Sequence, residues 1–358
     1  MKRYGNLFDE ICSFDNLMLA FRMARKTRRK REEVMRFEFD LEHNILELQE
    51  ELLNGTYRTG KYVKFFVYDP KKRLIMALPF RDRVVQWAIY QVVNPIFEAR
   101  YISTSYACRV GYGAHRSIKK LQSYLRRESL ETGKCFVLKL DISKYFYRVN
   151  HLVLMQELCR YLKDSRLLTL LHQIIYSKEK FGVECDDNTF DGRRIGNIGM
   201  PIGNLTSQMF ANLYLNRLDH FCKFNLKVRS YIRYMDDIVI VSATKGELRK
   251  YWKICNNFVQ KVLYLNLNNK SLIKTINQGF DFCGYKIWKS RISMRKKSAL
   301  RMKHRLKLLR KLFKYGEIKV EDYTSSLVSY LGALKHCSYD GLKLSILKSS
   351  VLRGVVHD

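Results

Sequence analysis

The feature that most constrains this chain is a stretch in which two adjacent carboxylates interrupt a run of β-forming residues. Residues 231–241 read YIRYMDDIVIV. This pattern predicts a strand, a tight turn and a second strand, with Asp236 and Asp237 at the tip. Neighbouring carboxylates repel each other, which raises the proton affinity of the pair. A divalent cation would explain such a pair, since Mg²⁺ prefers hard oxygen ligands; a solvated hairpin tip, where Asp is common, is the alternative.

The overall charge indicates a polyanionic partner. The chain has 66 Lys and Arg residues against 34 Asp and Glu residues, a net charge of +32. This excess favours nucleic acid, and an anionic membrane surface is the competing interpretation. We find no run of about 18 apolar residues that could cross a bilayer, and the polar start lacks the apolar stretch of a signal peptide.

Length and cysteine usage indicate an intracellular protein with several subdomains. A chain of 358 residues suits two or three subdomains around a shared core, and 47% hydrophobic residues can fill it. The nine cysteines are scattered and form no Cys-x-x-Cys pair. We therefore expect small buried thiols in a reducing cytosol rather than a zinc site, and a cytoplasmic location.

A second predicted hairpin, over residues 62–79, has a basic tip. Asp69-Pro70 marks its turn, Lys72 and Arg73 lie beside the turn, and Arg81 follows the second strand. Ammonium and guanidinium groups bind phosphate, so these residues suit a triphosphate clamp. A soluble turn without a ligand is the alternative.

A third carboxylate completes a pattern with the first two. Cys135–Leu140 reads as an apolar strand and ends in Asp141, for which a helix cap is the alternative role. An acid at the end of a buried strand, followed far downstream by an Asp-Asp hairpin, is the pattern of a two-metal polymerase site. In such a site one metal activates the primer 3′-hydroxyl and the other stabilises pyrophosphate.

Helical patterns surround these strands. Apolar residues at helical spacing predict helices over 41–53, 84–101, 116–127, 152–175, 209–224 and 248–263. The basic run Arg22–Arg31 also lies within a helical pattern. From Arg291 the chain becomes dense in Lys and Arg with interleaved Leu, which predicts a small basic helical domain that could grip a duplex. We expect an α+β fold.

Taken in order, these motifs resemble those of reverse transcriptases. The resemblance rests on Tyr234–Asp237 and Leu140–Phe146, and it continues through 80–85, 95–98, 105–109, Arg233 and 282–285. It implies an RNA-directed DNA polymerase with a right-hand architecture: fingers, a palm whose antiparallel sheet is backed by helices, and a helical thumb. The expected boundaries are 1–134 for the N-terminal region and fingers, 135–290 for the palm (with residues around 180–205 in the fingers), and 291–358 for the thumb.

The loop before the helix at 209–224 resembles one subfamily in particular. Most reverse transcriptases have Pro-Gln-Gly followed by Ser-Pro, whereas this chain has Pro201-Ile202-Gly203 followed by Ser207-Gln208. This block and the opening Lys2–Leu7 resemble the bacterial or phage-encoded reverse transcriptases of diversity-generating retroelements. The resemblance implies error-prone copying of a template RNA, concentrated at adenines, and a small basic accessory variability protein (oligomeric) as partner, with no role for a membrane.

The resemblance also implies roles for single residues. Asp141, Asp236 and Asp237, with the backbone oxygen of Ile142, would hold two Mg²⁺ ions, which Mn²⁺ could replace. Residues implied at the dNTP are Lys72, Arg73, Arg81, Ile202, Gly203 and Phe146, the last as a steric gate against a ribose 2′-hydroxyl. Residues implied at the primer or the RNA template are Arg109, His115, Gln208, Tyr234, Met235, Cys283, Gly284 and Tyr285.

Two alternatives stay open at this point. Another bacterial reverse transcriptase, from a group II intron or a retron, would share the carboxylates. The short segment after the basic helices speaks against the intron enzyme, and the Ile-Gly and Ser-Gln departures speak against the retron enzyme. A non-catalytic RNA-binding protein on the same fold is the second alternative, against which stands the presence of all three acids.

Overall fold

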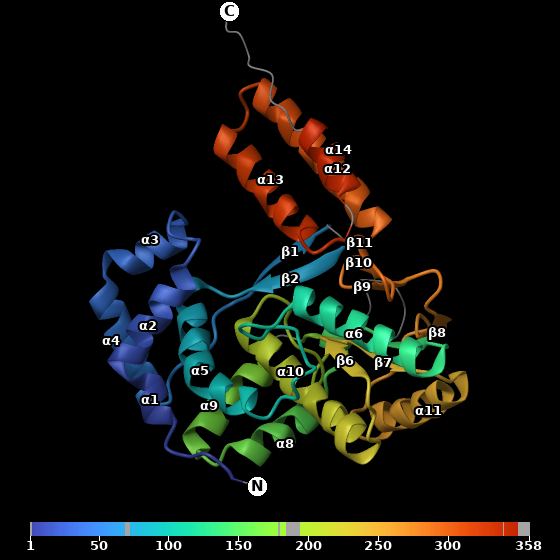
Figure 1. Ribbon diagram of the computed structural model, residues 1–358. Coiled ribbons are helices and arrows are strands. Elements are labelled where there is room, and N and C mark those ends of the chain that lie inside the picture. Colours follow the sequence, from blue (N-terminus) through green and yellow to red (C-terminus); the bar gives the residue numbers. More distant parts are fainter. Residues whose placement is uncertain (1, 69–71, 178–179, 184–193, 339, 350–358) are drawn as a thin grey trace, which may run out of the picture.

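A four-stranded antiparallel sheet lies at the centre of the computed structural model, which describes residues 2–68, 72–177, 180–183, 194–338 and 340–349. Its strand order is β6-β7-β3-β8 (Figure 1). The strands are β3 (Phe136–Asp141), β6 (Tyr231–Tyr234), β7 (Asp237–Ser242) and β8 (Leu272–Thr275). This sheet carries the predicted carboxylates at the ends of two neighbouring strands.

Both faces of the sheet are buried, because successive side chains of a strand point to opposite faces. Ile238 and Ile240 of β7 pack into the large core that includes α8 (His151–Tyr161), α10 (Leu205–His220) and α11 (Lys245–Lys261). Val239 and Val241 pack on the other side. There they meet α6 (Ala114–Thr132) and a small antiparallel sheet. The strands of this sheet are β9 (Phe280–Phe282), β10 (Tyr285–Ile287) and β11 (Ile292–Met294).

The N-terminal part is a helical layer that carries one hairpin. The helices are α1 (Phe8–Cys12), α2 (Phe14–Arg25), α3 (Glu32–Phe39), α4 (Leu41–Leu53) and α5 (Phe80–Glu98), and the hairpin strands are β1 (Val63–Val67) and β2 (Arg73–Ala77). Phe21, Phe37 and Phe80 pack ring against ring in this layer. The hairpin extends from it toward the C-terminal helices (Figure 1).

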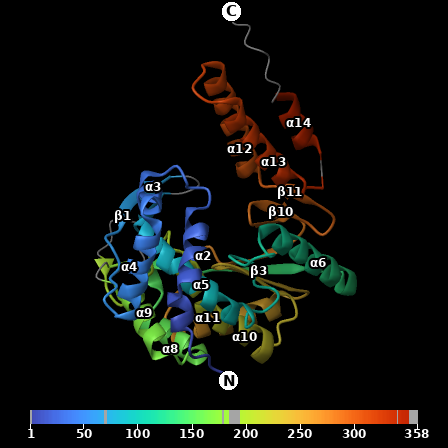
Figure 2. The same cartoon turned by 90° about the vertical axis from the view of Figure 1, so that its left-hand side faces the viewer.

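The C-terminal part is a three-helix unit with its own apolar core. Its helices are α12 (Lys296–Lys314), α13 (Val320–Leu334) and α14 (Gly341–Ser349). Buried residues of this core are Met302, Leu306, Leu309, Tyr323, Leu334 and Ile346. The unit stands above the palm-like sheet and is joined to it through β9–β11, as Figure 2 shows. Together these parts form the α+β right-hand architecture that the sequence predicts.

Several element bounds differ from the predictions for local reasons. The segment 152–175 is two helices, α8 and α9 (Ser165–Ile175), because the Asp164 carboxylate accepts from the Leu167 backbone N–H and starts a new helix. Helix α2 ends at Arg25, so most of the basic run 22–31 lies in the following turn. Helix α10 starts four residues early, at Leu205, and continues into the π-helix η1 (Phe221–Asn225).

The short strands β4 (Gly182–Val183) and β5 (Arg194–Ile195) pair with each other. The polar loop between them, and the Asp69–Lys71 turn of the first hairpin, lie outside the described residues. The expectation of buried thiols holds only in part: Cys108 is exposed, and three other cysteines are half-buried. Within the described ranges, no helix has the length and apolar character needed to span a bilayer.

A fully buried ion pair fastens β6 to α10. The guanidinium of Arg233 donates to Asp219 through Nε (2.8 Å to Oδ1) and Nη2 (2.7 Å to Oδ2), and both side chains are 0% exposed. The Tyr231 hydroxyl donates to Asp219 Oδ1 (2.7 Å), and Arg233 Nη1 donates to Asn212 Oδ1 (3.2 Å). Burial of two charges is costly, so the extra hydrogen bonds are needed to keep the pair in place.

We expect Asp219→Asn to lower the free energy of unfolding by about 3–5 kcal/mol, because it leaves the Arg233 charge buried without its counter-ion. Urea unfolding followed by far-UV circular dichroism measures the loss. Glu131→Gln is the matched control: it breaks a similar two-point pair with Arg229 (2.8 and 3.0 Å), but on the surface, where the cost is below about 1 kcal/mol. Equal losses in the two variants would contradict the assignment.

Candidate active site

The backbone brings the three predicted carboxylates to one end of the sheet. Asp141, the last residue of β3, is the Cα partner of Asp237, the first residue of β7. Asp236 lies in the turn between β6 and β7, and Met235 before it has a φ of 56°. A hydrogen bond fixes the backbone of this turn, because Arg233 Nη1 donates to the Met235 carbonyl (3.1 Å). The sequence reasoning that placed these residues together is consistent with this register.

The carboxylates are crowded enough to perturb one another. Burial raises the pKa of Asp236 to about 6, and the negative charges of Asp237 and Asp141 add to the rise. The guanidinium of Arg73, from the fingers-like hairpin, acts in the opposite direction. This mutual repulsion is the electrostatic condition that a bound cation relieves.

Lys139 is a member of the site that the sequence analysis missed. Its Nζ lies 2.7 Å from Asp237 Oδ1. It stands two residues before Asp141 on β3, and residues i and i+2 of a strand share a face. Strand alternation was therefore the signal that could have found it. The ammonium group partly neutralises the carboxylate cluster.

The donor set fits a hard divalent cation, although the side chains are not arranged as a finished cluster. Among the described residues, no three His, Cys, Asp or Glu side chains converge as a metal-binding group. The oxygens of Asp141, Asp236 and Asp237 are nonetheless the type that Mg²⁺ prefers, and their repulsion shows in the raised pKa of Asp236. Ile142 follows at the same strand end and bridges to Leu267.

Of the three basic residues predicted at the triphosphate, Arg73 is the one that the structure brings to the carboxylates. It begins β2 and acts electrostatically on Asp236. Lys72 Nζ lies 4.5 Å from the centre of the Phe66 ring in the same hairpin. Arg81 forms an ion pair with Glu51 (2.5 Å) at the start of α5, which ties it to the N-terminal helical layer.

The predicted nucleotide-side loop contacts the fingers-like hairpin. The Ile202 carbonyl accepts from the Met76 backbone N–H (3.0 Å) on β2. Gly203 has a φ of 129°, and a Cβ there would lie 3.1 Å from the Met76 carbonyl oxygen. Glycine at this position is thus explained by the approach of β2. Phe146, on α7 (Tyr145–Arg148), is half-buried and packs edge-on against Tyr145, with ring centres 5.7 Å apart.

Four of the residues predicted at the primer or template lie where β10, α6 and α13 come together. His115 Nε2 is 3.0 Å from the Tyr285 hydroxyl, which donates to the Ala333 carbonyl (2.9 Å). Cys283 and Gly284 form the tight turn before Tyr285, with φ values of 47° and 83°. His336 stacks on His115 with ring centres 3.6 Å apart. This histidine was missed because no motif links it to the distant His115.

Three further predicted residues take different places. Tyr234 ends β6 and lies edge-on to Phe282, with ring centres 6.4 Å apart. Gln208 is exposed and shares a cavity of about 260 Å³ with Arg109. The guanidinium of Arg109 is engaged inside the protein: it donates to Glu98 (2.8 Å) and to the carbonyls of Ile102 and Ser105.

The part of the chain that carries these residues matches one known protein family. A family model described as "Reverse transcriptase (RNA-dependent DNA polymerase)" matches residues 68–287. The chain is therefore a member of the reverse transcriptase family, and it is an RNA-directed DNA polymerase by class.

Several curated proteins are similar to this chain. It is 28% identical over 310 residues to Protein YkfC of Escherichia coli (strain K12), covering 76% of this chain and 73% of that protein. It is 29% identical over 178 residues to nuclear intron maturase 4, mitochondrial, of Arabidopsis thaliana, covering 48% and 20%. It is 25% identical over 186 residues to the group II intron-encoded protein LtrA of Lactococcus lactis subsp. cremoris, covering 50% and 28%.

The chain thus spans less than a third of each of these two intron-related proteins. Among solved structures, apo telomerase from Candida tropicalis is similar with a TM-score of 0.49 and 11% identity, covering 82% of this chain and 63% of that chain.

The raised pKa of Asp236 predicts a stability change with a defined pH dependence. The folded protein binds the Asp236 proton more tightly than the unfolded chain, so stability falls as pH rises from 3.8 toward about 6. We expect Asp236→Asn, without divalent cations, to raise the free energy of unfolding at pH 7 by about 1–3 kcal/mol, and the gain to shrink toward pH 4. Urea unfolding at both pH values measures it.

Asp9→Asn, at an exposed carboxylate paired with Arg166, is the control and should change little at either pH. Addition of Mg²⁺ should then stabilise the native sequence more than Asp236→Asn. A loss of stability in Asp236→Asn at pH 7 would contradict the electrostatic account.

Proposed function

We propose that this chain is the reverse transcriptase of a diversity-generating retroelement, which copies a template RNA into cDNA with errors concentrated at adenines. The observation that carries the proposal is the loop Pro201-Ile202-Gly203, whose sequence departs from that of most reverse transcriptases. This loop is hydrogen-bonded to β2, the strand that also begins with Arg73. A substitution in it is therefore adjacent to the elements expected to hold the incoming nucleotide.

The carboxylates Asp141, Asp236 and Asp237, with the Ile142 backbone oxygen, would hold two Mg²⁺ ions or Mn²⁺ in their place. Bound there, the ions supply activation of the primer 3′-hydroxyl and charge neutralisation of the leaving pyrophosphate. Arg73 opposes the negative charge of the site, and it is our first choice for the triphosphate contact. The ring of Phe146 would exclude a ribose 2′-hydroxyl.

The remaining parts would grip the nucleic acid. We propose fingers over 1–134 and around 180–205, a palm over 135–290 and a thumb from 291. Helix α12 is dense in Lys and Arg, as the phosphates of an RNA/cDNA duplex require. Besides the template RNA and dNTPs, the subfamily resemblance points to a small basic accessory protein as partner.

We expect the double variant Asp236→Ala with Asp237→Ala to lose primer extension by at least about 1,000-fold, because positioned charge is the main contribution to phosphoryl transfer. A gel assay with primed RNA, dNTPs and Mg²⁺ measures it. Asp9→Ala with Glu10→Ala removes another adjacent pair of acids, both exposed on α1, and should keep full extension. Retained polymerisation in the first variant would refute the assignment.

We expect Ile202→Gln to lower misincorporation opposite template adenines by about 3–30-fold. A site without a polar side chain near the substrate discriminates less, and a glutamine amide would restore such a contact. Deep sequencing of cDNA from the two enzymes measures the error spectrum. Ile202→Leu keeps an apolar side chain of the same size and should leave the spectrum unchanged. An identical spectrum in all three enzymes would reject the role of this residue.

A reverse transcriptase of the group II intron type, without the adenine bias, is the second candidate. It is favoured by the 25–29% identity to the intron-related proteins described above. The same cDNA sequencing separates the two candidates, since errors spread evenly over the four template bases would favour the intron type.

A further inference from the structure

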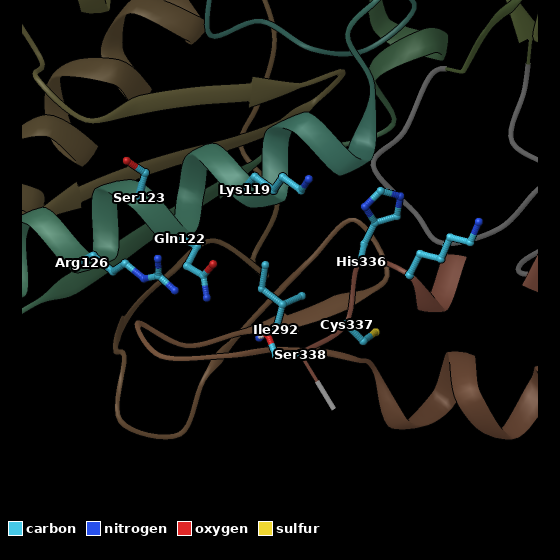
Figure 3. A pocket seen from close by; sticks show the side chains of 9 residues that line it. Lys119, Gln122, Ser123, Arg126, Ile292, His336, Cys337 and Ser338 are labelled. Atoms are coloured by element: carbon cyan, nitrogen blue, oxygen red, sulfur yellow. Dashed lines mark hydrogen bonds between the residues drawn. The ribbon is translucent and has the colours of Figure 1, made fainter. Parts of the chain in front are cut away.

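A basic pocket lies outside the carboxylate site, between α6 and the segment that leads away from α13. Its volume is about 460 Å³. The lining consists of Lys119, Gln122, Ser123, Arg126, Ile292, Lys335, His336, Cys337 and Ser338. Figure 3 shows the α6 side chains on one side and Ile292 with His336–Ser338 on the other. The lining contains no acidic residue and no Phe, Tyr or Trp.

Three cationic side chains of the pocket are exposed and can bind an anion. Lys119 and Arg126 are exposed and lie on one face of α6, at i and i+7. Lys335 enters from the other side and is also exposed. In the part of the chain that the structure describes, no carboxylate forms an ion pair with any of these three residues.

Hydrogen bonds to the backbone fix several of the side chains that line the pocket. Arg126 Nε donates to the Lys289 carbonyl (2.7 Å), and Gln122 Nε2 donates to the Trp288 carbonyl (3.3 Å). The Ser338 hydroxyl accepts from the Ile292 backbone N–H (2.9 Å). These bonds leave the remaining guanidinium nitrogens of Arg126 for a ligand, in a geometry suited to phosphate oxygens.

Two stacked imidazoles, of His115 and His336, lie at one end of the pocket and are held toward their neutral form. Burial lowers the pKa of His115, and the Lys119 ammonium lowers it further. Burial likewise lowers the pKa of His336, with contributions from His115 and Lys119. The smaller contribution of Lys119 is charge repulsion, which a bound anion would offset.

The pocket begins beside the predicted primer contact, where His336 stacks on His115, and extends from there along α6. His115 touches Tyr285 at the start of α6, and Arg126 lies about 16 Å farther along the helix at 1.5 Å per residue. In Figure 2, α6 runs from beneath β10 away from the N-terminal helices. The Arg126 end of the pocket is therefore placed for a segment of nucleic acid that lies beyond the predicted primer contact.

We propose that this pocket binds the backbone phosphates of a structured segment of RNA outside the primer–template site. Phosphodiester binding is favoured over base recognition because no Phe, Tyr or Trp lines the pocket, and the ring of His336 is already stacked on His115. The hydroxyls of Ser123 and Ser338 can pair with 2′-hydroxyls, through which proteins distinguish RNA from DNA. Recognition of folded RNA through phosphates and 2′-hydroxyls needs no sequence readout.

The test compares two triple variants of the full chain. Lys119→Ala with Arg126→Ala and Lys335→Ala empties the pocket of its cations. The matched control, Arg249→Ala with Lys250→Ala and Lys253→Ala, removes the same charges from the exposed face of α11. Binding is measured by fluorescence anisotropy, without dNTPs, on a long hairpin RNA with a primed 3′ tail and on a short primed RNA duplex.

We expect the pocket variant to bind the long hairpin RNA about 10–100-fold more weakly, and the control variant less than about 3-fold more weakly. The slope of log affinity against log salt should fall by about 2–3, one for each lost phosphate contact. Binding of the short duplex should not change. A DNA hairpin of the same sequence should lose less affinity than the RNA.

Three results would overturn the proposal: equal losses in the two variants, an equal loss on the long and short RNA, or displacement of the long RNA by inorganic phosphate at sub-millimolar concentration. The last result would assign the pocket to a small anion. Because the choice of RNA rests on the proposed function, extension of the short duplex is measured separately. Absent extension by the native sequence would reject the polymerase proposal and leave the binding result standing.

Discussion

The buried pair of Arg233 and Asp219 is the interaction on which the rest of the site depends. Two charges with no exposed surface persist only if nearly every donor and acceptor around them is satisfied. Here Asp219 accepts from the Tyr231 hydroxyl and from the Arg233 guanidinium, while Arg233 also donates to the Met235 carbonyl in the turn that carries Asp236. The pair thus connects the core helix α10 to the backbone that carries Asp236. Carboxylates that repel one another stay close together only if the backbone that carries them is rigid.

The carboxylates themselves oppose folding in the absence of a cation. Burial and mutual repulsion raise the pKa of Asp236. Two cations oppose this repulsion: Lys139 of the sheet pairs with Asp237, and Arg73 of the hairpin lowers the pKa of Asp236. Such local strain is characteristic of functional sites and is compensated elsewhere in the structure. The large cores on both faces of the sheet supply that compensation.

Local pattern predicted the parts of this molecule that depend on nearby residues. The strand–turn–strand at Asp236 and the strand ending in Asp141 follow from β-forming residues and turn position, and their pairing placed Asp141 opposite Asp237. Contacts between distant segments were not predictable in this way. The stack of His336 on His115 and the pairing of Asp219 with Arg233 each require the tertiary fold. The break at Asp164 was missed because a capping Asp gave a weaker signal than the continuous leucine pattern around it.

The role that we propose for position 202 is compatible with an unchanged fold. The contact that fixes this loop is made by the Ile202 backbone carbonyl, which accepts from Met76. A backbone hydrogen bond does not depend on side-chain identity, and the close approach of β2 is met by Gly203 rather than by Ile202. The half-buried Ile202 side chain is therefore free to change its polarity at small cost in stability. Selection on copying accuracy could act on this side chain while the hairpin, the loop and the carboxylates keep their geometry.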